Sequence, residues 1–366
     1  MKCPHCNQEH PDEFLFCPIT GNKIVTNVPY ANGNLHDYDH IDSFYEGRSI
    51  VSKDGKYGVI DLNGSVMVPC KYSKILRFSE GVAACQVESG CWSFMNRMGH
   101  IVLSLPDGLD VISDIGFKEG LCAVSGYVED EEDNSELKYG FIDKNGNLVI
   151  GLQYDYANDY NDGLAVVSID GEDGDYQIYI NKAGEQAIPY DYCACHDFVG
   201  NYAVAKIESG KWVVIDQNAR LIFKLINKES KWVDIGADFV SYGLGEKQLW
   251  FRPDNPEKHF FGNNVKSIWS GFSEGYIAVL SSIYNKWGYV SGQGEEAIPF
   301  VYDEAHNFKE GLAAVKIGDL WGYVDYNGTM VIKPIYDEAT DFCETRAIVK
   351  KDDKYIVIDK FGNICF

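Results

Sequence analysis

The chain has 366 residues, with 55 acidic against 32 basic side chains and a formal net charge of −23. This surplus of carboxylates excludes the usual nucleic-acid binders, because phosphate backbones require clustered Lys and Arg. No apolar run approaches the roughly 18 residues that span a bilayer, and the N-terminus lacks the apolar centre of a signal peptide, so we expect a cytoplasmic protein with no membrane partner.

The first predicted element is a metal-binding segment over residues 1–24. Cys3-Pro4-His5-Cys6 and Phe16-Cys17-Pro18 resemble the two knuckles of a short zinc ribbon, with Thr20 where a fourth cysteine is expected. Zinc prefers four tetrahedral nitrogen and sulfur ligands. For one structural zinc ion we therefore predict the ligands Cys3, Cys6, His10 and Cys17. His5 is the weaker substitute for His10, and the alternative is a decayed knuckle without metal.

Residues 25–37 are predicted to be a linker, and residues 38–366 an array of repeats. A glycine recurs after an aromatic-rich strand at intervals of 35, 47, 38, 35, 75, 34 and 34 residues, at Gly64, Gly99, Gly146, Gly184, a substituted Ala219, Gly294, Gly328 and Gly362. Such a period indicates stacked or ringed repeats. Since 75 is close to two periods, we expect an eroded copy at about residues 231–262, and about nine units in all.

Each unit is predicted to be a β-meander of three strands. Residues 320–325 are rich in aromatic and β-branched side chains and lead into Asp-x-Asn-Gly, which is typical of a strand and its hairpin turn. The returning strand ends at Pro334, which cannot donate a ladder hydrogen bond. A third strand, residues 312–315, is entered through Glu-Gly. No long apolar pattern has a helical period, so the fold class is all-β.

The array permits two architectures. A lone unit cannot bury its apolar face, so each copy depends on its neighbours. A closed propeller-like ring would remove exposed sheet edges. Nine units of three strands would nevertheless be an uncommon ring, and we favour an open solenoid slightly over the ring.

The repeated motifs resemble the WG-repeat family of bacterial proteins, from about Tyr38 to Phe366. The resemblance is carried by the Trp/Tyr-Gly strands at 57–61, 139–143, 287–290 and 321–325, together with the fixed Tyr-Asp, Phe and Glu-Gly-Leu-Ala spacing. The glycine is lost at Cys91-Trp92-Ser93, Gln177-Ile178 and Trp212-Val213. The resemblance implies a β-repeat binding or scaffold role and supplies no catalytic residues.

Two acidic insertions, at 129–133 and 170–175, occupy the same turn position of their units. Closely spaced carboxylates can bind calcium, but the repeat favours enlarged, solvated turns. Insertions in repeat proteins often collect on the binding face, so a basic partner protein is a hypothesis. The simpler interpretation is that turns at this edge tolerate extra length.

Other candidate residues are explained by the repeat. Cys193-Ala194-Cys195-His196 suggests a metal site or a thiol nucleophile, but His306 occupies the same position in another unit, which favours a loop histidine. Asp61, Asp143, Asp325 and Asp359 fall on repeated turns rather than in a catalytic set. Eight cysteines are scattered through the array without recurring spacing, which predicts reduced thiols.

Most of the 24 Tyr and 7 Trp occupy repeated, architectural positions. A site that stacks rings on sugars would need aromatics outside that register, and Trp232, Trp250 and Trp269 in the eroded region qualify. We therefore expect a non-enzymatic scaffold that binds another protein, with a carbohydrate or cell-wall-fragment binding module as the alternative. No nucleophile elbow, phosphate-binding glycine loop or metal helix supports an enzyme.

Native mass spectrometry with and without a chelator tests the predicted zinc site. We expect one zinc ion per chain, which the chelator removes. So short a segment has too little apolar core to fold alone, and we therefore expect its folding to depend on the metal. Replacing Cys17 by Ser should abolish zinc binding, whereas replacing Cys193 by Ser should leave it unchanged. A metal-free wild-type chain would identify the segment as a decayed knuckle.

Overall fold

The computed structural model describes residues 35–87, 90–129, 135–171, 174–224, 230–236, 239–244, 247–252, 255–260, 265–268 and 271–366. Within these ranges the chain is almost wholly β, apart from the single-turn 3₁₀ helix η1 (Leu35–Asp37). None of the helices in this part has the length and apolar character needed to cross a bilayer. The predicted metal segment and most of the linker lie outside the described residues.

The described strands form nine small antiparallel sheets, here called units 1 to 9 in chain order. Units 1 to 3 contain β1 (His40–Ile41), β2 (Arg48–Lys53), β3 (Lys56–Asp61) and β4 (Val66–Tyr72); β5 (Lys74–Ile75), β6 (Val82–Gln86), β7 (Trp92–Asn96) and β8 (Ile101–Ser104); and β9 (Leu109–Val111), β10 (Leu121–Glu129), β11 (Ser135–Asp143) and β12 (Leu148–Tyr154).

Units 4 to 6 contain β13 (Tyr156–Ala157), β14 (Ala165–Ile169) and β15 (Tyr176–Ile180); β16 (Ala194–Cys195), β17 (Tyr202–Lys206), β18 (Trp212–Asp216) and β19 (Leu221–Lys224); and β20 (Ser230–Gly236), β21 (Phe239–Leu244), β22 (Lys247–Arg252) and β23 (Asn255–Phe260). Unit 6 lies where the sequence places the eroded copy.

Units 7 to 9 contain β24 (Val265–Ile268), β25 (Tyr276–Ser281), β26 (Trp287–Ser291) and β27 (Glu296–Tyr302); β28 (Glu304–Ala305), β29 (Ala313–Ile317), β30 (Leu320–Val324) and β31 (Met330–Tyr336); and β32 (Glu338–Ala339), β33 (Ala347–Lys351) and β34 (Lys354–Ile358). Among the described residues, seven sheets have four strands and two have three. Most units thus have one strand more than the three predicted from the sequence. The additional strand is the first of the unit, and the sequence pattern does not reveal it because it is usually only two residues long.

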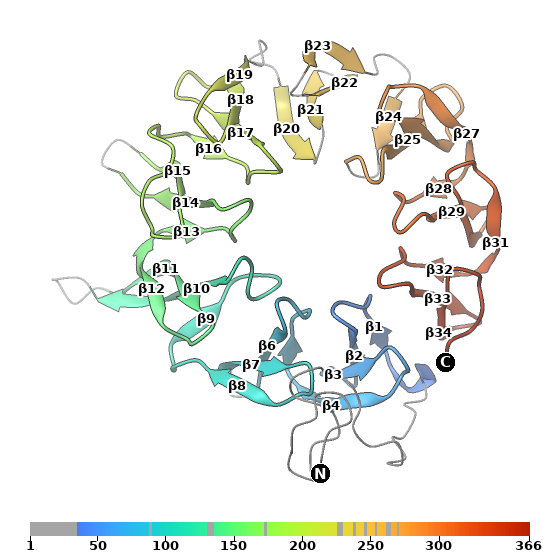
Figure 1. Cartoon of the computed structure of the whole chain (residues 1–366), viewed down its shortest axis with the longest axis horizontal. Helices are drawn as coiled ribbons and strands as arrows, with labels where there is room; N and C mark the ends of the chain where they lie inside the picture. Colours follow the sequence, from blue (N-terminus) through green and yellow to red (C-terminus); the bar gives the residue numbers. More distant parts are fainter. Residues whose placement is uncertain are drawn as a thin grey trace, which may run out of the picture.

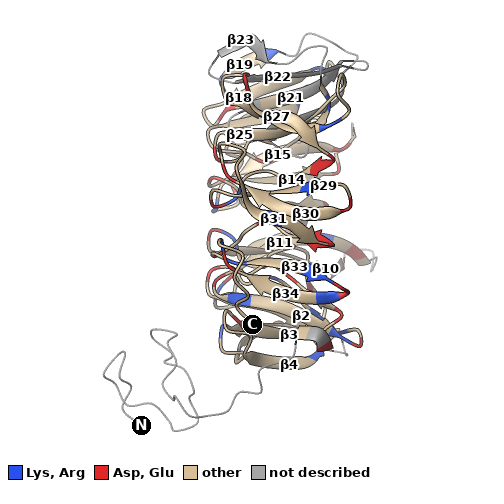
Figure 2. Ribbon diagram, turned by 90° about the vertical axis from the view of Figure 1, so that its right-hand side faces the viewer, with Lys and Arg blue, Asp and Glu red and all other residues tan. Residues whose placement is uncertain are grey.

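The units follow one another around a ring (Figure 1). In unit 8 the short first strand β28 lies nearer the centre of the ring and the last strand β31 lies at the outer rim. Figure 2 shows the ring from the side as a single layer of units, with charged residues on the turns at both faces. The all-β repeat array predicted from the sequence is confirmed.

The ring is closed by contacts between the first and last units, which corrects the slight preference for an open array. Ile41 and Phe44 of unit 1 share one buried cluster with Ile348 and Val357 of unit 9. The ring of Phe366 lies over Gly64, where an added Cβ would come within 2.4 Å of it. Closure is favoured because the two terminal units bury apolar faces that an open array would leave in water.

The glycine of the Trp-Gly strand is required by backbone packing. In unit 8 a Cβ on Gly322 would lie 2.5 Å from the carbonyl oxygen of Ile332 and 2.7 Å from the nitrogen of Pro334. The pairing of β30 with β31 shifts register on both sides of Tyr323, so the two backbones approach closely at this irregularity. Only glycine permits that approach.

A buried tyrosine of the third strand joins units 4, 7 and 8 to the unit that follows each of them. Tyr323 is fully buried, and its hydroxyl donates a hydrogen bond of 2.7 Å to the carbonyl oxygen of Thr340 in unit 9. Phe342, the anchor aromatic of unit 9, packs edge-on against the same ring at 4.9 Å between centroids. Equivalent hydroxyl bonds run from Tyr179 to His196 and from Tyr289 to His306.

The Glu-Gly motif supplies a second contact between units. Its acidic residue has a positive φ of 51 to 54° at seven positions, and its carboxylate accepts a backbone N–H from the same motif of the next unit. The pairs are Glu46 with Gly81, Glu80 with Gly120, Glu119 with Gly163, Asp162 with Gly200, Glu274 with Gly311, Glu310 with Thr345, and Glu344 with Gly47.

The last of these pairs spans the closure, at 2.6 Å between the nitrogen of Gly47 and Oε2 of Glu344. In several units a lysine of the next hairpin turn also pairs with the carboxylate, as Lys360 does with Glu310 at 3.0 Å. Burial raises the pKa of Glu310, but the hydrogen bonds from Lys360 and from the backbone of Thr345 outweigh it and hold the pKa below its usual value. The Glu310 carboxylate is therefore an ionised part of the frame.

Replacing Glu344 by Ala should loosen the closure. We expect the free energy of unfolding in urea to fall by about 1–2 kcal/mol, since a backbone donor loses its charged acceptor. Glu344→Gln keeps an acceptor oxygen and should lose less. As a matched control, Glu338→Ala in the same unit removes only an exposed ion pair and should change stability by less than about 1 kcal/mol. Equal losses for the two alanine variants would contradict a special role of Glu344.

Candidate functional site

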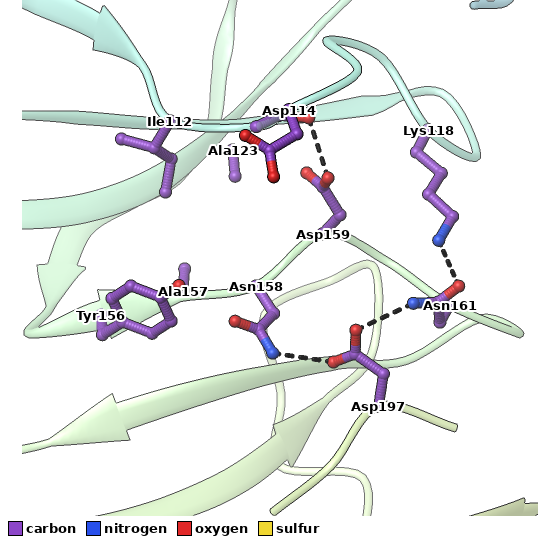
Figure 3. Close-up of a pocket in the computed structure, with 11 residues that line it drawn as sticks. Ile112, Asp114, Lys118, Ala123, Tyr156, Ala157, Asn158, Asp159, Asn161 and Asp197 are labelled. Atoms are coloured by element: carbon purple, nitrogen blue, oxygen red, sulfur yellow. Dashed lines mark hydrogen bonds between the residues drawn. The ribbon is translucent and has the colours of Figure 1, made fainter. Parts of the chain in front are cut away.

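A polar pocket of about 240 Å³ lies among the inner loops of units 3, 4 and 5 (Figure 3). Unit 3 contributes the loop between β9 and β10 and one residue of β10, unit 4 contributes β13 and the loop after it, and unit 5 contributes the loop after β16. The lining residues are Ile112, Ser113, Asp114, Lys118, Ala123, Tyr156, Ala157, Asn158, Asp159, Asn161 and Asp197.

The repeat places two of these carboxylates, because Asp159 and Asp197 each directly precede the anchor aromatic of their unit. Each reaches back to the preceding unit. Ser113 donates its hydroxyl hydrogen to Oδ2 of Asp159 at 2.8 Å. Asn158 and Asn161 both donate to Asp197, each at 2.9 Å. The inner loops are thus tied together across two unit boundaries, and the pocket is held open between them.

The pocket has more carboxylate groups than positively charged donors. Three carboxylates, those of Asp114, Asp159 and Asp197, face a single lysine, Lys118, which already hydrogen-bonds Oδ1 of Asn161. Oδ1 of Asp159 is buried and has no hydrogen-bond partner. A buried acceptor without a donor costs about 1–3 kcal/mol, and more when it is charged. The arrangement therefore favours the arrival of an external donor.

The electrostatics of Asp159 follow from this arrangement. Burial raises the pKa of its carboxyl group, and the nearby charges of Asp197 and Asp114 raise it further. The hydrogen bond from Ser113 and the charge of Lys118 act in the opposite direction but do not cancel the effect. A cation bound beside Asp159 would favour the ionised form and be bound more tightly by it.

A unit boundary with an amide at this position is satisfied internally. In unit 8 the position of Asp159 is taken by Asn307, which is buried. Its amide donates to the carbonyl oxygen of Gly271 and accepts the backbone N–H of Ala278 at 3.1 Å. An amide can both donate and accept, whereas a carboxylate can only accept. Asp197 and Asp341 are aspartates at the same position, and they have partners in Asn158 and Asn161 and in His306. Among the described residues, the unmet acceptor is therefore particular to Asp159.

The lining groups are suited to an ammonium or guanidinium group. Across the described ranges, no three His, Cys, Asp or Glu side chains are close enough together to hold a metal ion. Carboxylates and amide oxygens that are spread around a pocket suit a larger cation with several N–H donors. The ring of Tyr156 forms part of the wall and can cover the carbon chain of such a group.

A second, larger pocket of about 850 Å³ lies between units 4 and 5. Unit 4 lacks a full fourth strand, and the bent segment 186–192 takes its place through single bridges to β15. Tyr190 in this segment is 58% exposed. The lining residues are Gly171, Gly174, Asp175, Tyr176, Gln186, Pro189, Tyr190, Asp191, Tyr192, Cys193 and Glu208.

Several of the site residues predicted from the sequence lie outside the part of the chain that the structure describes. Cys3, Cys6, His10 and Cys17 lie outside the described residues, as do Trp269 and most of the insertion at 129–133; the side chains of Trp232 and Trp250 are also not described. At 170–175, the backbone of Asp170 donates to Asp155 and that of Gly174 to Gly171, which is the geometry of a turn.

The Cys193–His196 segment contains the two-residue strand β16, and His196 lies in the loop that follows it. Burial raises the pKa of the Cys195 thiol to about 12, which leaves little reactive thiolate near neutral pH. His196 packs edge-on against Trp212 at 5.4 Å between ring centroids. These contacts agree with the loop interpretation. The eight cysteines of the described array are free thiols.

Sequence reasoning missed both pockets. The available signal for the first was an aspartate directly before the anchor aromatic in two consecutive units, Asp159 and Asp197. For the second pocket the sequence holds no signal, because residues 184–192 keep the turn-and-strand motif of residues 294–302. The signal for the first pocket does not show by itself that loops from different units meet.

Comparison with known proteins shows the repeat family and the fold. Six segments match the WG containing repeat, at residues 36–57, 57–89, 139–172, 179–212, 287–321 and 321–355, together more than half of the chain. No protein of curated function matches the sequence significantly.

Solved structures with a similar fold share little sequence with this chain. A eukaryotic initiation factor is 10% identical, with 88% of this chain and 96% of that one covered and a TM-score of 0.55. BamB from Moraxella catarrhalis is 10% identical, with 78% and 92% covered and a TM-score of 0.41. Hsv2 from Kluyveromyces lactis is 13% identical, with 85% and 93% covered and a TM-score of 0.33. At such identities the likeness concerns the fold alone, and the first of the three supports an all-β repeat arrangement.

Proposed function

Because the chain belongs to the family of WG containing repeats, we propose that it is a non-enzymatic scaffold that binds a basic partner protein through the surface of its ring. The observation that carries this proposal is the unpartnered oxygen of Asp159 in a pocket with three carboxylates and one lysine. A Lys or Arg side chain of the partner would supply the missing donor.

The ring is suited to present such a pocket. The buried tyrosine hydroxyls and the Glu-Gly carboxylates fix neighbouring units to one another, so the loops that form the pocket are arranged before a partner arrives. Pre-arranged sites lose less conformational entropy on binding. The formal net charge of −23 would also attract a basic partner and speed the encounter.

A scaffold role also accounts for the many carboxylates outside the pocket. In the hairpin turns, Oδ1 of Asp325 accepts the backbone N–H groups of Asn327 and Thr329, each at 2.9 Å. Asp143 and Asp359 accept N–H groups in the same way. These aspartates hold the hairpin turns of the frame.

A short lysine peptide and the same peptide with an acetylated lysine test the proposal by isothermal titration calorimetry. Asp159→Asn should weaken binding of the charged peptide about tenfold or more, since one charge-assisted hydrogen bond contributes about 1.5–3 kcal/mol. The matched control, Asp319→Asn, removes one exposed charge from unit 8 and should leave affinity unchanged. Equal effects of both variants, or equal binding of both peptides, would contradict the pocket.

The pH dependence has a defined sign. Since the pKa of Asp159 is raised, its carboxylate becomes protonated as the pH falls, before the pH reaches the ordinary aspartate value of about 3.9. Affinity for the lysine peptide should therefore decrease on acidification above that value, and Asp159→Asn should remove this part of the decrease.

Carbohydrate or cell-wall-fragment binding is the second candidate, and the pocket between units 4 and 5 favours it. Exposed Tyr190 lies beside Tyr176, Asp191 and Gln186, and a ring with planar polar neighbours can stack on a sugar and bind its hydroxyls. Tyr190→Ala should reduce the affinity for soluble cell-wall oligosaccharides at least tenfold in calorimetric titrations. Asp159→Asn should not. Unchanged binding by Tyr190→Ala would exclude this pocket.

A further inference from the structure

Most of the described outer strands contain proline or charged residues that hinder pairing with other chains, and the exceptions are the four-residue β8 and the longer β12. An edge strand presents unpaired backbone groups, and proteins protect such edges with proline or charge. β4 contains Pro69 and Lys71, and β27 contains Glu296 and Pro299. β31 contains Lys333 and Pro334.

β12 in unit 3 is the longer of these two strands. Its sequence, Leu-Val-Ile-Gly-Leu-Gln-Tyr, has seven residues without proline or charge. Among the described strands it pairs only with β11, so its other edge is unpaired. Gly151 occupies the position three residues before the last tyrosine, where β4 and β27 carry their prolines. Glycine restores a backbone N–H at this position, and nothing lies within 4 Å of where its Cβ would be.

The side chains of β12 divide between core and solvent. Ile150 and Tyr154 are buried against the next unit, whereas Leu148 and Val149 are 45% and 46% exposed. Leu103 of β8 lies against Gly146, in the turn that leads into β12. Ile101 and Val102 of β8, in the neighbouring unit 2, are exposed as well.

The far end of β12 is acidic. β10 and β11 are nine residues long and extend beyond β12 as a hairpin, with Glu129 opposite Ser135. Asp155 directly follows β12, and Lys138 is held between Glu136 at 2.9 Å and Asp155 at 2.7 Å. Lys138 neutralises only one of these two carboxylates, so this end of β12 keeps a surplus of negative charge.

An apolar continuation is present at the same end. Tyr127 and Leu137 stand opposite each other across the hairpin and are 71% and 41% exposed. A second copy of this chain would bring the same acidic end and another net charge of −23, which opposes self-pairing. The charges instead suit a strand with an apolar body and a basic end.

We propose that the outer edge of β12 is a docking edge, to which an extended segment of a partner protein adds as a fifth strand of unit 3, with its Lys or Arg residues beside Glu136 and Asp155. This inference deepens the proposed scaffold function and rests on it. Seven paired residues would extend over about 23 Å. Main-chain hydrogen bonds would supply affinity, and the exposed Leu148 and Val149 would select apolar side chains.

The test uses a fluorescent eight-residue peptide, Lys-Lys-Val-Thr-Val-Thr-Val-Thr, and the full chain. Its matched control is the same peptide with alternate backbone nitrogens methylated, which keeps charge and side chains but removes the donors on one edge. We expect binding of the first peptide and at least tenfold weaker binding of the second. Equal affinities, or no measurable binding of the unmethylated peptide, would overturn the proposal.

Variants of the edge complete the experiment. Gly151→Pro should weaken binding at least tenfold, because it restores the guard found in β4 and β27, whereas Gly151→Ala should bind as the wild type does. Val149→Lys, at an exposed position, should weaken binding because it removes an apolar contact with the valines of the peptide, and it serves if the proline variant does not fold. Wild-type affinity in Val149→Lys and in a folded Gly151→Pro would overturn the docking edge.

Two further measurements distinguish the docking edge from the Asp159 pocket and from pairing between two copies of the chain. Asp159→Asn should bind the eight-residue peptide normally, so failure of the pocket and failure of the edge are read independently. Sedimentation of the wild type should show a monomer. A dimer that Gly151→Pro dissociates would overturn the proposal in favour of pairing between two copies.

Discussion

The structure depends on the contact that each unit makes with the next one. A tyrosine that is buried in one sheet donates its hydroxyl hydrogen to the inner loop of the following sheet and packs against its anchor aromatic, as Tyr323 does with Thr340 and Phe342. A small sheet has too little apolar area to fold alone. The free energy that stabilises any one unit therefore comes largely from its neighbours.

This dependence explains why the ends of the array meet. In an open array the first and last units would each lack one neighbour, and Ile41, Phe44, Ile348 and Val357 would face water. Closure places them in one cluster and lets Glu344 accept the N–H of Gly47 as its counterparts do elsewhere. The same contacts fix the inner loops, so the pocket at Asp159 is formed by units that are already locked together.

The repeat also makes departures from the pattern informative. Where every unit needs a residue type for the frame, a unit that differs is free to do something else. Asp159 leaves one oxygen without a donor, whereas Asp197 and Asn307 at the same position are satisfied. Gly151 stands where β4 carries Pro69. Both departures lie in units 3 and 4, which places a candidate pocket and a candidate docking edge in neighbouring parts of the ring.

The sequence by itself determined the period, the all-β class, the hairpin turns and the place of the eroded copy, because these follow from local chemistry. Gly322 beside an aromatic, Asp325 at a turn and Pro334 on an edge each act within one unit. Only the tertiary structure decided ring closure, the short inner strand and the pocket. These depend on residues such as Phe44 and Ile348, or Ser113, Asp159 and Asp197, which come from different units and meet only after the units have packed.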